Sequence, residues 1–408
     1  MQANSLQLSM VTSPKGAYLT VEGKPDAKQF FILRSGRVQV SQEVGHPDDQ
    51  SNLILEPGDF FGVVSTMSAQ SHLETAIALT DVSLIAVQRD QYGLLIQKNT
   101  PVAMKIILEF SRRMRYLDEA VTKTTFKNTA TEGPEHLFTV GEYYSRQNQY
   151  NQAFYAYYRY LQHCPEDKNV ETARDRLRKV KSYAESVKMD QPNNSMNRIY
   201  PKNTMFFSES EPGSEMFIIQ KGRVKITKIV DEQEILIAIL KPGEFFGEMA
   251  LLENKPRSAS AIAHDDDVSV LVVEKTNFER MVKTQAELIT RLTITLAERI
   301  WTVGRTLANA SINNPTGRLY DQLLLQLEKN RVPINRSNNY TFDFGPKELI
   351  NMVGLSHADG NLHTRKLIEN NKISIVNNRI FVSDVEEIQK QTKHFRRMEK
   401  LQKIRDDG

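Results

Sequence analysis

One run of the sequence, from Gly247 to Ser258, carries residue types suited to binding an anion. Gly247 permits a tight backbone turn, and residues 248–252 can form a short helix whose first N–H groups are free to hold a negative charge. Arg257 follows a proline and presents a planar fork of donors that matches a phosphate, with the Ser258 hydroxyl beside it. The predicted chemistry of this run is the recognition of a phosphate group.

Glu248 is an unusual neighbour for such a site, because a carboxylate repels a phosphate. It becomes useful if the same ligand also carries a neutral hydroxyl group, since a carboxylate accepts a hydrogen bond strongly. A phosphate and a ribose 2′-hydroxyl on one small molecule indicate a nucleotide. The competing interpretation is that Glu248 and Arg257 pair with each other across an empty site.

The order of Gly-Glu, an apolar run and Pro-Arg-Ser-Ala resembles the phosphate-binding cassette of cyclic-nucleotide-binding domains. The resemblance implies that Glu248 binds the ribose, that Arg257 binds the cyclic phosphate and that the backbone from Gly247 to Ala250 forms the cradle. It predicts a nucleotide site at Gly247, Glu248, Met249, Ala250, Arg257 and Ser258, with no metal ion.

The same resemblance implies that polar residues on a following long helix meet the nucleobase. The corresponding stretch here offers Trp301, by stacking, or Thr302, whereas a place in the core is the simpler role for Trp301. Cyclic AMP is the expected ligand because the resemblance is to bacterial regulators. Cyclic GMP stays open as the alternative.

The elements that must position this run occur twice in the chain. The segment Pro57-Gly58-Asp59-Phe60-Phe61-Gly62 returns as Pro242-Gly243-Glu244-Phe245-Phe246-Gly247. Each copy also has a Gly-Arg-Val turn between an apolar strand and an alternating strand, and a final apolar strand at 82–87 or 268–273. Short strands separated by Gly and Pro predict a jelly-roll-like β-sandwich in each copy.

The first copy departs from the cassette pattern. Val63 follows its glycine, and Ser71-His72-Leu73-Glu74-Thr75-Ala76 occupies the place of the Pro-Arg-Ser run. A phosphate would lose hydration there for little return and would meet the charge of Glu74. The first copy is therefore predicted to be a degenerate domain with a structural or protein-contacting role, and a ligand other than a phosphate is left open.

Residues 135–184, between the copies, are predicted to be helical and are rich in tyrosine. Their pattern resembles one tetratricopeptide repeat, carried by Gly141, Tyr144, Tyr150, Ala153, Tyr157 and Pro165. A single repeat cannot bury its own face, so it must pack on a neighbouring domain or dock a protein partner. The polar segment 190–195 is predicted to end this unit.

A long helix is predicted after the second copy, from an apolar stripe with spacings of 4, 4, 4, 3 and 4 at Leu288, Leu292, Leu296, Ile300, Val303 and Leu307. A narrow seam on a long helix favours pairing with a twin helix, which predicts a homodimer. Packing of the helix against its own barrel is the alternative.

The last segment predicts two helices joined by a turn at Gly354-Leu355, then a β-hairpin at 373–382. With the barrel, the long helix and a Thr316-Gly317-Arg318 hinge, this order resembles the Crp/Fnr regulators from about residue 199 to 384. The resemblance implies DNA binding through a winged helix-turn-helix, with Ser356, His357, Asn361 and Arg365 as candidate contacts. Asp359 and Gly360 are atypical in a recognition helix, so protein contact is the competing role.

Composition sets the limits of these interpretations. The chain has 408 residues, a net charge of +3 and one cysteine, and shows no long apolar run, no P-loop, no Gly-x-Ser-x-Gly hydrolase motif and no His-Glu-x-x-His zinc-protease motif. We therefore expect a cytoplasmic, non-enzymatic, multidomain α+β protein without a membrane segment. Its predicted units are a degenerate barrel with helix (1–125), a helical linker (126–190), a nucleotide-binding barrel with long helix (191–310) and a winged helix with a basic tail (311–408).

Two functions follow from these units. The first is a dimeric, cyclic-nucleotide-binding transcriptional regulator that binds DNA. The alternative is a nucleotide-sensing scaffold that uses the tyrosine-rich repeat and the winged helix for protein contacts and does not bind DNA.

Overall fold

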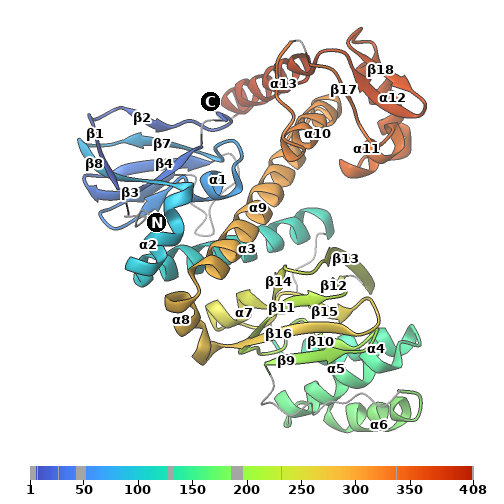
Figure 1. Cartoon of the computed structure of the whole chain (residues 1–408). Coiled ribbons are helices and arrows are strands. Elements are labelled where there is room, and N and C mark those ends of the chain that lie inside the picture. Colours follow the sequence, from blue (N-terminus) through green and yellow to red (C-terminus); the bar gives the residue numbers. More distant parts are fainter. Residues whose placement is uncertain are drawn as a thin grey trace.

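The computed structural model describes residues 6, 8–25, 27–42, 52–126, 133–184, 196–230, 232–336 and 338–406. Two β-sandwiches and a C-terminal unit are joined by long helices that cross near the middle of the molecule (Figure 1). The predicted boundary at 190–195 lies outside the described residues. No helix in the described ranges is long and apolar enough to span a lipid bilayer.

The first sandwich consists of two four-stranded sheets, in the orders β1-β8-β3-β6 and β2-β7-β4-β5. Its strands are β1 (Ser9–Ser13), β2 (Tyr18–Thr20), β3 (Gln29–Ser35), β4 (Val38–Gln42), β5 (Asn52–Leu55), β6 (Phe60–Phe61), β7 (Glu74–Ala78) and β8 (Val82–Gln88). Its helices are α1 (Val63–Ser68), the 3₁₀ turn Arg89–Gln91, α2 (Tyr92–Lys98) and α3 (Thr100–Phe126). Alternate residues of β4 and β8 point inward, which buries one face of each sheet.

The second sandwich repeats this topology, with sheets in the orders β14-β11-β16-β9 and β10-β15-β12-β13. Its strands are β9 (Asn197–Tyr200), β10 (Met205–Phe207), β11 (Glu215–Lys221), β12 (Val224–Val230), β13 (Gln233–Leu240), β14 (Phe245–Phe246), β15 (Ser260–Ala263) and β16 (Val268–Glu274). Its helices are α7 (Glu248–Glu253), α8 (Lys275–Thr284) and α9 (Ala286–Ala310). The matching strand orders confirm the duplication predicted from the repeated Pro-Gly segment.

The apolar stripe of α9 is buried inside this chain. Leu292, Leu296 and Ile300 are at most 1% exposed and share one core with Phe110 and Met114 of α3. Helix α9 also packs on α1 of the first sandwich, and α3 packs on α7 of the second. The predicted pairing of this seam with a second copy is therefore wrong, because the duplicated first half of the chain supplies the partner helix.

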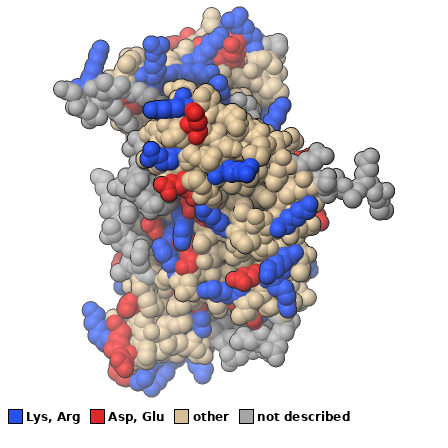
Figure 2. Space-filling model, turned by 90° about the vertical axis from the view of Figure 1, so that its left-hand side faces the viewer, with Lys and Arg blue, Asp and Glu red and all other residues tan. Residues whose placement is uncertain are grey.

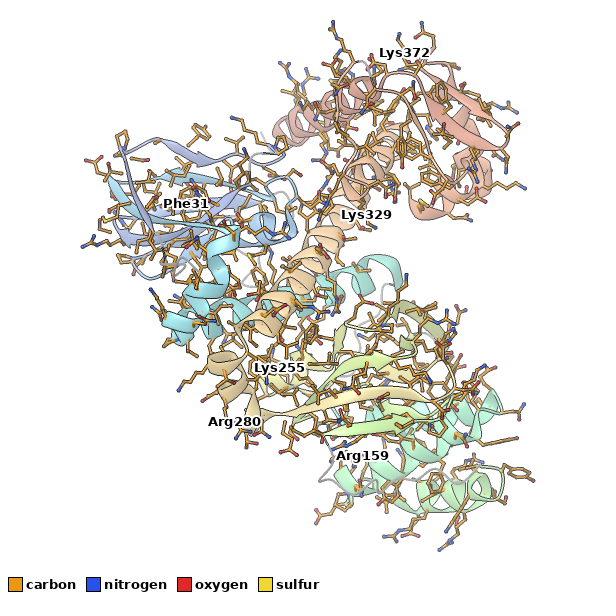
Figure 3. The ribbon with its side chains drawn as sticks, viewed as in Figure 1. Phe31, Arg159, Lys255, Arg280, Lys329 and Lys372 are labelled. Carbon is orange, nitrogen blue, oxygen red and sulfur yellow. The ribbon has the colours of Figure 1, made fainter. Side chains whose placement is uncertain are left out.

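Helix α5 (Tyr150–His163) packs on strand β10 of the second sandwich, and α4 (His136–Arg146) and α6 (Val170–Lys181) pack on α5 (Figure 1). Their aromatic core includes Met205 and Ile262 of that sandwich. Arg159 of α5, labelled in Figure 3, forms an ion pair with Glu211 in the loop between β10 and β11. Of the two expected roles of this segment, packing on a neighbouring domain is the one that these contacts show.

The C-terminal unit has its own apolar core. It contains α10 (Pro315–Lys329), β17 (Tyr340–Thr341), α11 (Pro346–Met352), α12 (His357–Ile368), β18 (Ile373–Val376), β19 (Arg379–Val382) and α13 (Val385–Asp406). The predicted Thr316-Gly317 hinge lies instead within the first turn of α10, which begins at Pro315 with Asn314 as its cap. Gly317 is needed there because a Cβ would lie 2.9 Å from Phe395 of α13.

A buried polar cluster fixes the joint between α9 and α10. The Asp321 carboxylate is inaccessible to solvent and accepts hydrogen bonds from Arg305, Arg396 and Asn309. Arg305 also pairs with Glu328, whose second carboxylate oxygen accepts a bond from Ser71 of the first sandwich. The orientation of the C-terminal unit is thereby tied to both the long helix and the first sandwich.

Candidate functional site

The predicted cassette of the second sandwich forms a tight turn followed by a short helix. Gly247 has a φ of 77°, in the left-handed region, and comes directly before α7. A Cβ at this position would lie 2.6 Å from the Arg257 guanidinium and 3.0 Å from Phe207, so only glycine fits. Lys255, labelled in Figure 3, marks the loop that leads from α7 back into strand β15.

Arg257 is buried beside this turn, and no carboxylate of the described residues forms an ion pair with it. Its side chain is 6% exposed, its Nη1 donates to the Gly247 carbonyl over 2.6 Å, and its guanidinium lies 4.1 Å above the Phe207 ring. Its Nε is buried without a hydrogen-bond partner among the described residues.

The burial of Arg257 affects its pKa. Burial lowers the pKa of Arg257, while the charges of Glu211 and other nearby groups act in the opposite direction from farther away. A buried cation of this kind is stabilised by any anion that enters the cavity beside it. Arg257 therefore has the burial, the free donor and the charge expected of an anion-binding residue.

Glu248 is bonded to an arginine other than the one expected. Its carboxylate is 2% exposed and pairs with Arg299 of α9 over 3.0 Å. The interpretation in which Glu248 and Arg257 pair with each other is therefore wrong. The two groups face one cavity from different sides, and Arg257 is left available for a ligand.

The cavity between these groups has a volume of about 40 Å³. The structure brings all six predicted nucleotide contacts into its wall, which comprises Phe207, Ile226, Leu240, Phe246, Gly247, Glu248, Met249, Ala250, Arg257, Ser258, Ala259 and Arg299. Pockets that enclose drug-sized ligands have at least about 300 Å³. The cavity as it stands is smaller than this, and the Glu248–Arg299 pair forms part of its wall.

Sequence reasoning missed Arg299 and the contribution of helix α3. Ser111 and Arg115 of α3 donate hydrogen bonds to Glu253 at the end of α7, over 2.7 and 2.9 Å. The repeat contained a signal for Arg299, because Arg113 has the equivalent position on the other long helix. Each arginine lies 13 residues after the first residue of its helix, α3 or α9.

The predicted base contacts lie elsewhere. Trp301 is 1% exposed and its indole N–H donates to the Ser71 carbonyl of the first sandwich over 3.0 Å. Neither Trp301 nor Thr302 lines the second cavity. For Trp301 the simpler role in the core holds, because its indole packs on the first sandwich. The base contact of Thr302 stays a prediction.

The first sandwich has a cavity of about 240 Å³ at the equivalent position, which contains its own anion. One oxygen of Glu74 accepts a hydrogen bond from the backbone N–H of Gly62, the counterpart of Gly247, over 2.6 Å. The other oxygen accepts from Gln42 and lies 3.6 Å from Arg113. A cation is thus present after all, supplied by α3 and not by the cassette, and the Glu74 carboxylate is bonded to the N–H of the turn glycine.

The candidate DNA contacts lie around helix α12, where their side chains have different environments. Asn361 and Arg365 are exposed, whereas the Ser356 hydroxyl caps the helix by accepting from the N–H of Asp359 and donating to its carboxylate. His357 begins the helix, and its side chain lies outside the described part. Gly360 is explained by packing, because a Cβ would lie 2.4 Å from Ile350 of α11.

Among the described residues, no group of three or more His, Cys, Asp or Glu side chains is placed to hold a metal ion. The chemistry of both cavities rests on the arginines and carboxylates described above.

Comparison with known proteins agrees with this geometry. Residues 10–99 and 197–285 match the family model of the cyclic nucleotide-binding domain. The chain is 42% identical over 91 residues to human cGMP-dependent protein kinase 2, a match that spans 22% of this chain but only 12% of the kinase.

Two bacterial proteins are similar over a longer stretch. The CRP-like cAMP-activated global transcriptional regulator of Mycobacterium tuberculosis is 25% identical over 190 residues, which is 46% of this chain and 84% of that protein. The crystal structure of the Thermus thermophilus catabolite activator protein covers 49% of this chain and 90% of that one, at 23% identity and a TM-score of 0.28. The two duplicated sandwiches coincide with the two segments, residues 10–99 and 197–285, that are similar to the cyclic nucleotide-binding domain.

Proposed function

We propose that this protein is a non-enzymatic regulator in which the second sandwich binds a cyclic nucleotide and the C-terminal unit binds DNA as a winged helix-turn-helix. The observation that carries the proposal is Arg257, a buried arginine with a free donor and no paired carboxylate among the described residues. Cyclic AMP is the first candidate, as in the related bacterial regulators, and cyclic GMP is the second, as in the related kinases.

The DNA-binding part of the proposal rests on the order α11, turn, α12 and hairpin, together with the similarity to CRP-like regulators. Basic side chains are prominent at the upper end of the molecule, which the C-terminal unit forms (Figure 2). The α9 seam is buried against α3 of the same chain, so the two sandwiches of one chain already pair with each other. Each chain has one α12 helix. A homodimer, if the DNA site has two halves, must form through another surface.

An electrophoretic shift assay with the intact chain tests this proposal. We expect DNA binding that weakens as salt rises and that strengthens when cyclic AMP or cyclic GMP is added. Replacing the exposed Arg365 by alanine is expected to weaken specific binding by about 1–3 kcal/mol. The matched control is Arg178→Ala on α6, an equally exposed arginine at the opposite end of the molecule (Figure 1). Absence of a shift with and without either nucleotide, at low salt, would favour the protein-binding scaffold.

Nucleotide stoichiometry provides a separate prediction. We expect calorimetric titration to find one cyclic nucleotide per chain, because Glu74 occupies the cradle of the first domain. In the Glu74→Ala variant, the Gly62 N–H and Arg113 lose their anion, and we expect a second, weaker site.

The matched control for this titration is Asp59→Ala. Asp59 lines the same cavity and pairs with Lys105 over 2.8 Å, but does not contact the cradle N–H. It should leave the stoichiometry at one. Two sites in the parent chain, or one site in Glu74→Ala, would contradict the assignment of Glu74 as the internal anion.

A further inference from the structure

One loop of the second sandwich, residues 208–214 between β10 and β11, supports Arg257 from its backbone to its guanidinium group. The N–H of Arg257 donates to the Glu211 carbonyl over 2.9 Å, and the N–H of Ser210 donates to the Arg257 carbonyl over 2.8 Å. A Cβ on Gly213 would lie 2.2 Å from Nε of Arg257, so a side chain there would push the guanidinium aside. The position of Arg257 in the cavity wall therefore depends on where this loop lies.

Helix α5 of the linker holds this loop through the carboxylate of Glu211, which is 3% exposed. The carboxylate accepts hydrogen bonds from Nε of Arg159 over 2.6 Å, from the Tyr155 hydroxyl over 3.1 Å and from the N–H of Ser208 over 3.0 Å. A buried carboxylate is costly without its cation, so Glu211 and the loop that carries it stay where Arg159 can reach them. The ion pair thereby fixes the loop to α5 at the residue whose carbonyl bonds to Arg257.

Helix α4 holds the same loop at a second point. Nε2 of His136 lies 3.1 Å from a carboxylate oxygen of Glu209, which is 2% exposed. The Glu209 carboxylate also accepts from the N–H of Ile229 in β12, and the N–H of Glu209 donates to the Ser260 hydroxyl at the start of β15. Two helices of the linker therefore contact two acidic residues of the loop that lies beside Arg257.

The first sandwich shows which part of this arrangement belongs to the second sandwich alone. Its equivalent loop makes the same backbone pair, because the N–H of His72 donates to the Lys24 carbonyl and the N–H of Gly23 donates to the His72 carbonyl. Lys24 therefore has the place of Glu211. It is exposed, whereas Glu211 is buried and bonded to α5. Since the backbone pair forms without a buried carboxylate, the contact with α5 adds something beyond the local fold of the loop.

On the basis of the proposed function, we propose that the helical linker is part of the nucleotide site, with Arg159 and Glu211 as positioning residues for Arg257. Apart from its bond to the Gly247 carbonyl, the Arg257 guanidinium is held by packing on Phe207 and on the loop. With Glu211 bonded to α5, the loop keeps this guanidinium in the cavity wall, where a phosphate meets it. A displacement of α5 from the sandwich therefore lowers nucleotide affinity, and by linkage a bound nucleotide strengthens the contact between α5 and the loop.

The test is calorimetric titration of the intact chain with cyclic AMP and cyclic GMP. We expect Arg159→Ala to bind about tenfold more weakly than the parent chain, and Glu211→Gln to show a loss of similar size. Because both residues act through one contact, the double variant should bind no more weakly than the weaker single variant. Arg159→Lys keeps the charge without the planar fork and should bind with intermediate affinity.

A second cycle asks whether the effect passes through Arg257. In the Arg257→Lys background, the guanidinium that the loop positions is absent, so adding Arg159→Ala should lower the affinity by clearly less than tenfold. An equal loss in both backgrounds would show that the linker does not act through Arg257, and would overturn the inference.

The matched control is Arg176→Ala. Arg176 of α6 pairs with Glu142 of α4 over 3.0 Å, within the linker and away from the loop. It should bind like the parent, with thermal unfolding reporting on the stability of both variants. If Arg176→Ala weakens binding as much as Arg159→Ala, general stability of the linker explains the effect and the inference is wrong. If Arg159→Ala and Glu211→Gln bind with the parent affinity, it is wrong while the proposed function stands. If the parent chain binds neither nucleotide, both are overturned.

Discussion

The Arg257→Ala variant is expected to lose cyclic-nucleotide binding by the second domain. Arg257 is the cation of the cavity, and the loss of a buried partner of a phosphate costs about 2–5 kcal/mol, or about 30-fold to 4,000-fold in affinity. The fold should survive this change, because burial already disfavours the charged form of Arg257 and no described carboxylate depends on it for an ion pair. Calorimetric titration measures the loss, and thermal unfolding reports on the fold.

Two further variants sharpen this result. Arg257→Lys keeps the charge but loses the planar fork and should bind with an intermediate affinity. Arg223→Ala is the matched control, since Arg223 lies on the surface of the same sandwich in a pair with Asp265 and should leave binding unchanged. Parent-like binding by Arg257→Ala would show that the ligand does not occupy this cavity.

The Asp321→Ala variant is expected to destabilise the joint between α9 and α10 by about 3–5 kcal/mol. Asp321 is fully buried and pairs with both Arg305 and Arg396, so its removal takes a shared buried anion from two cations, of which Arg305 keeps its pair with Glu328. Urea unfolding of the intact chain measures the change. Nucleotide binding should persist while its effect on DNA binding is lost, because none of Asp321, Arg305 and Arg396 lines the cavity of the second sandwich.

The control for this variant is Asp175→Ala. Asp175 forms an exposed pair with Arg178 on α6, and surface pairs of this kind contribute about 0–1 kcal/mol. An unfolding curve for Asp321→Ala that overlaps the curve of this control would show that the polar cluster does not hold the C-terminal unit in place.

Local sequence patterns predicted the elements of both sandwiches well. The Pro-Gly turns, the Gly-Arg-Val turns and the apolar strands recur as β3, β8, β11 and β16 in identical sheet orders, because alternation and turn chemistry act over a few residues. The anion cradle was predictable for the same reason. Gly247, the start of α7 and Arg257 are close in sequence, and their geometry follows from one turn and one short helix.

The partners of these groups were not predictable in the same way. Arg299 is 51 residues from Glu248, Glu74 is 12 residues from the N–H that it occupies, and Trp301 is 230 residues from its acceptor Ser71. A stripe on a helix shows that the helix has an apolar partner but does not show which one. The seam of α9 therefore indicated a twin helix, which proved to be α3 of the same chain.

The sequence alone determined that this protein has two sandwiches of one type, that the second has a cassette suited to a phosphate and a hydroxyl, and that the first lacks that pattern. Only the tertiary structure decided that the two halves pair with each other, that Glu74 accepts the N–H of Gly62 and that Arg299 pairs with Glu248. The physical reason is that short-range periodicity and turn chemistry are local properties of the chain, whereas the pairing of buried charges and helix seams depends on which distant surfaces meet.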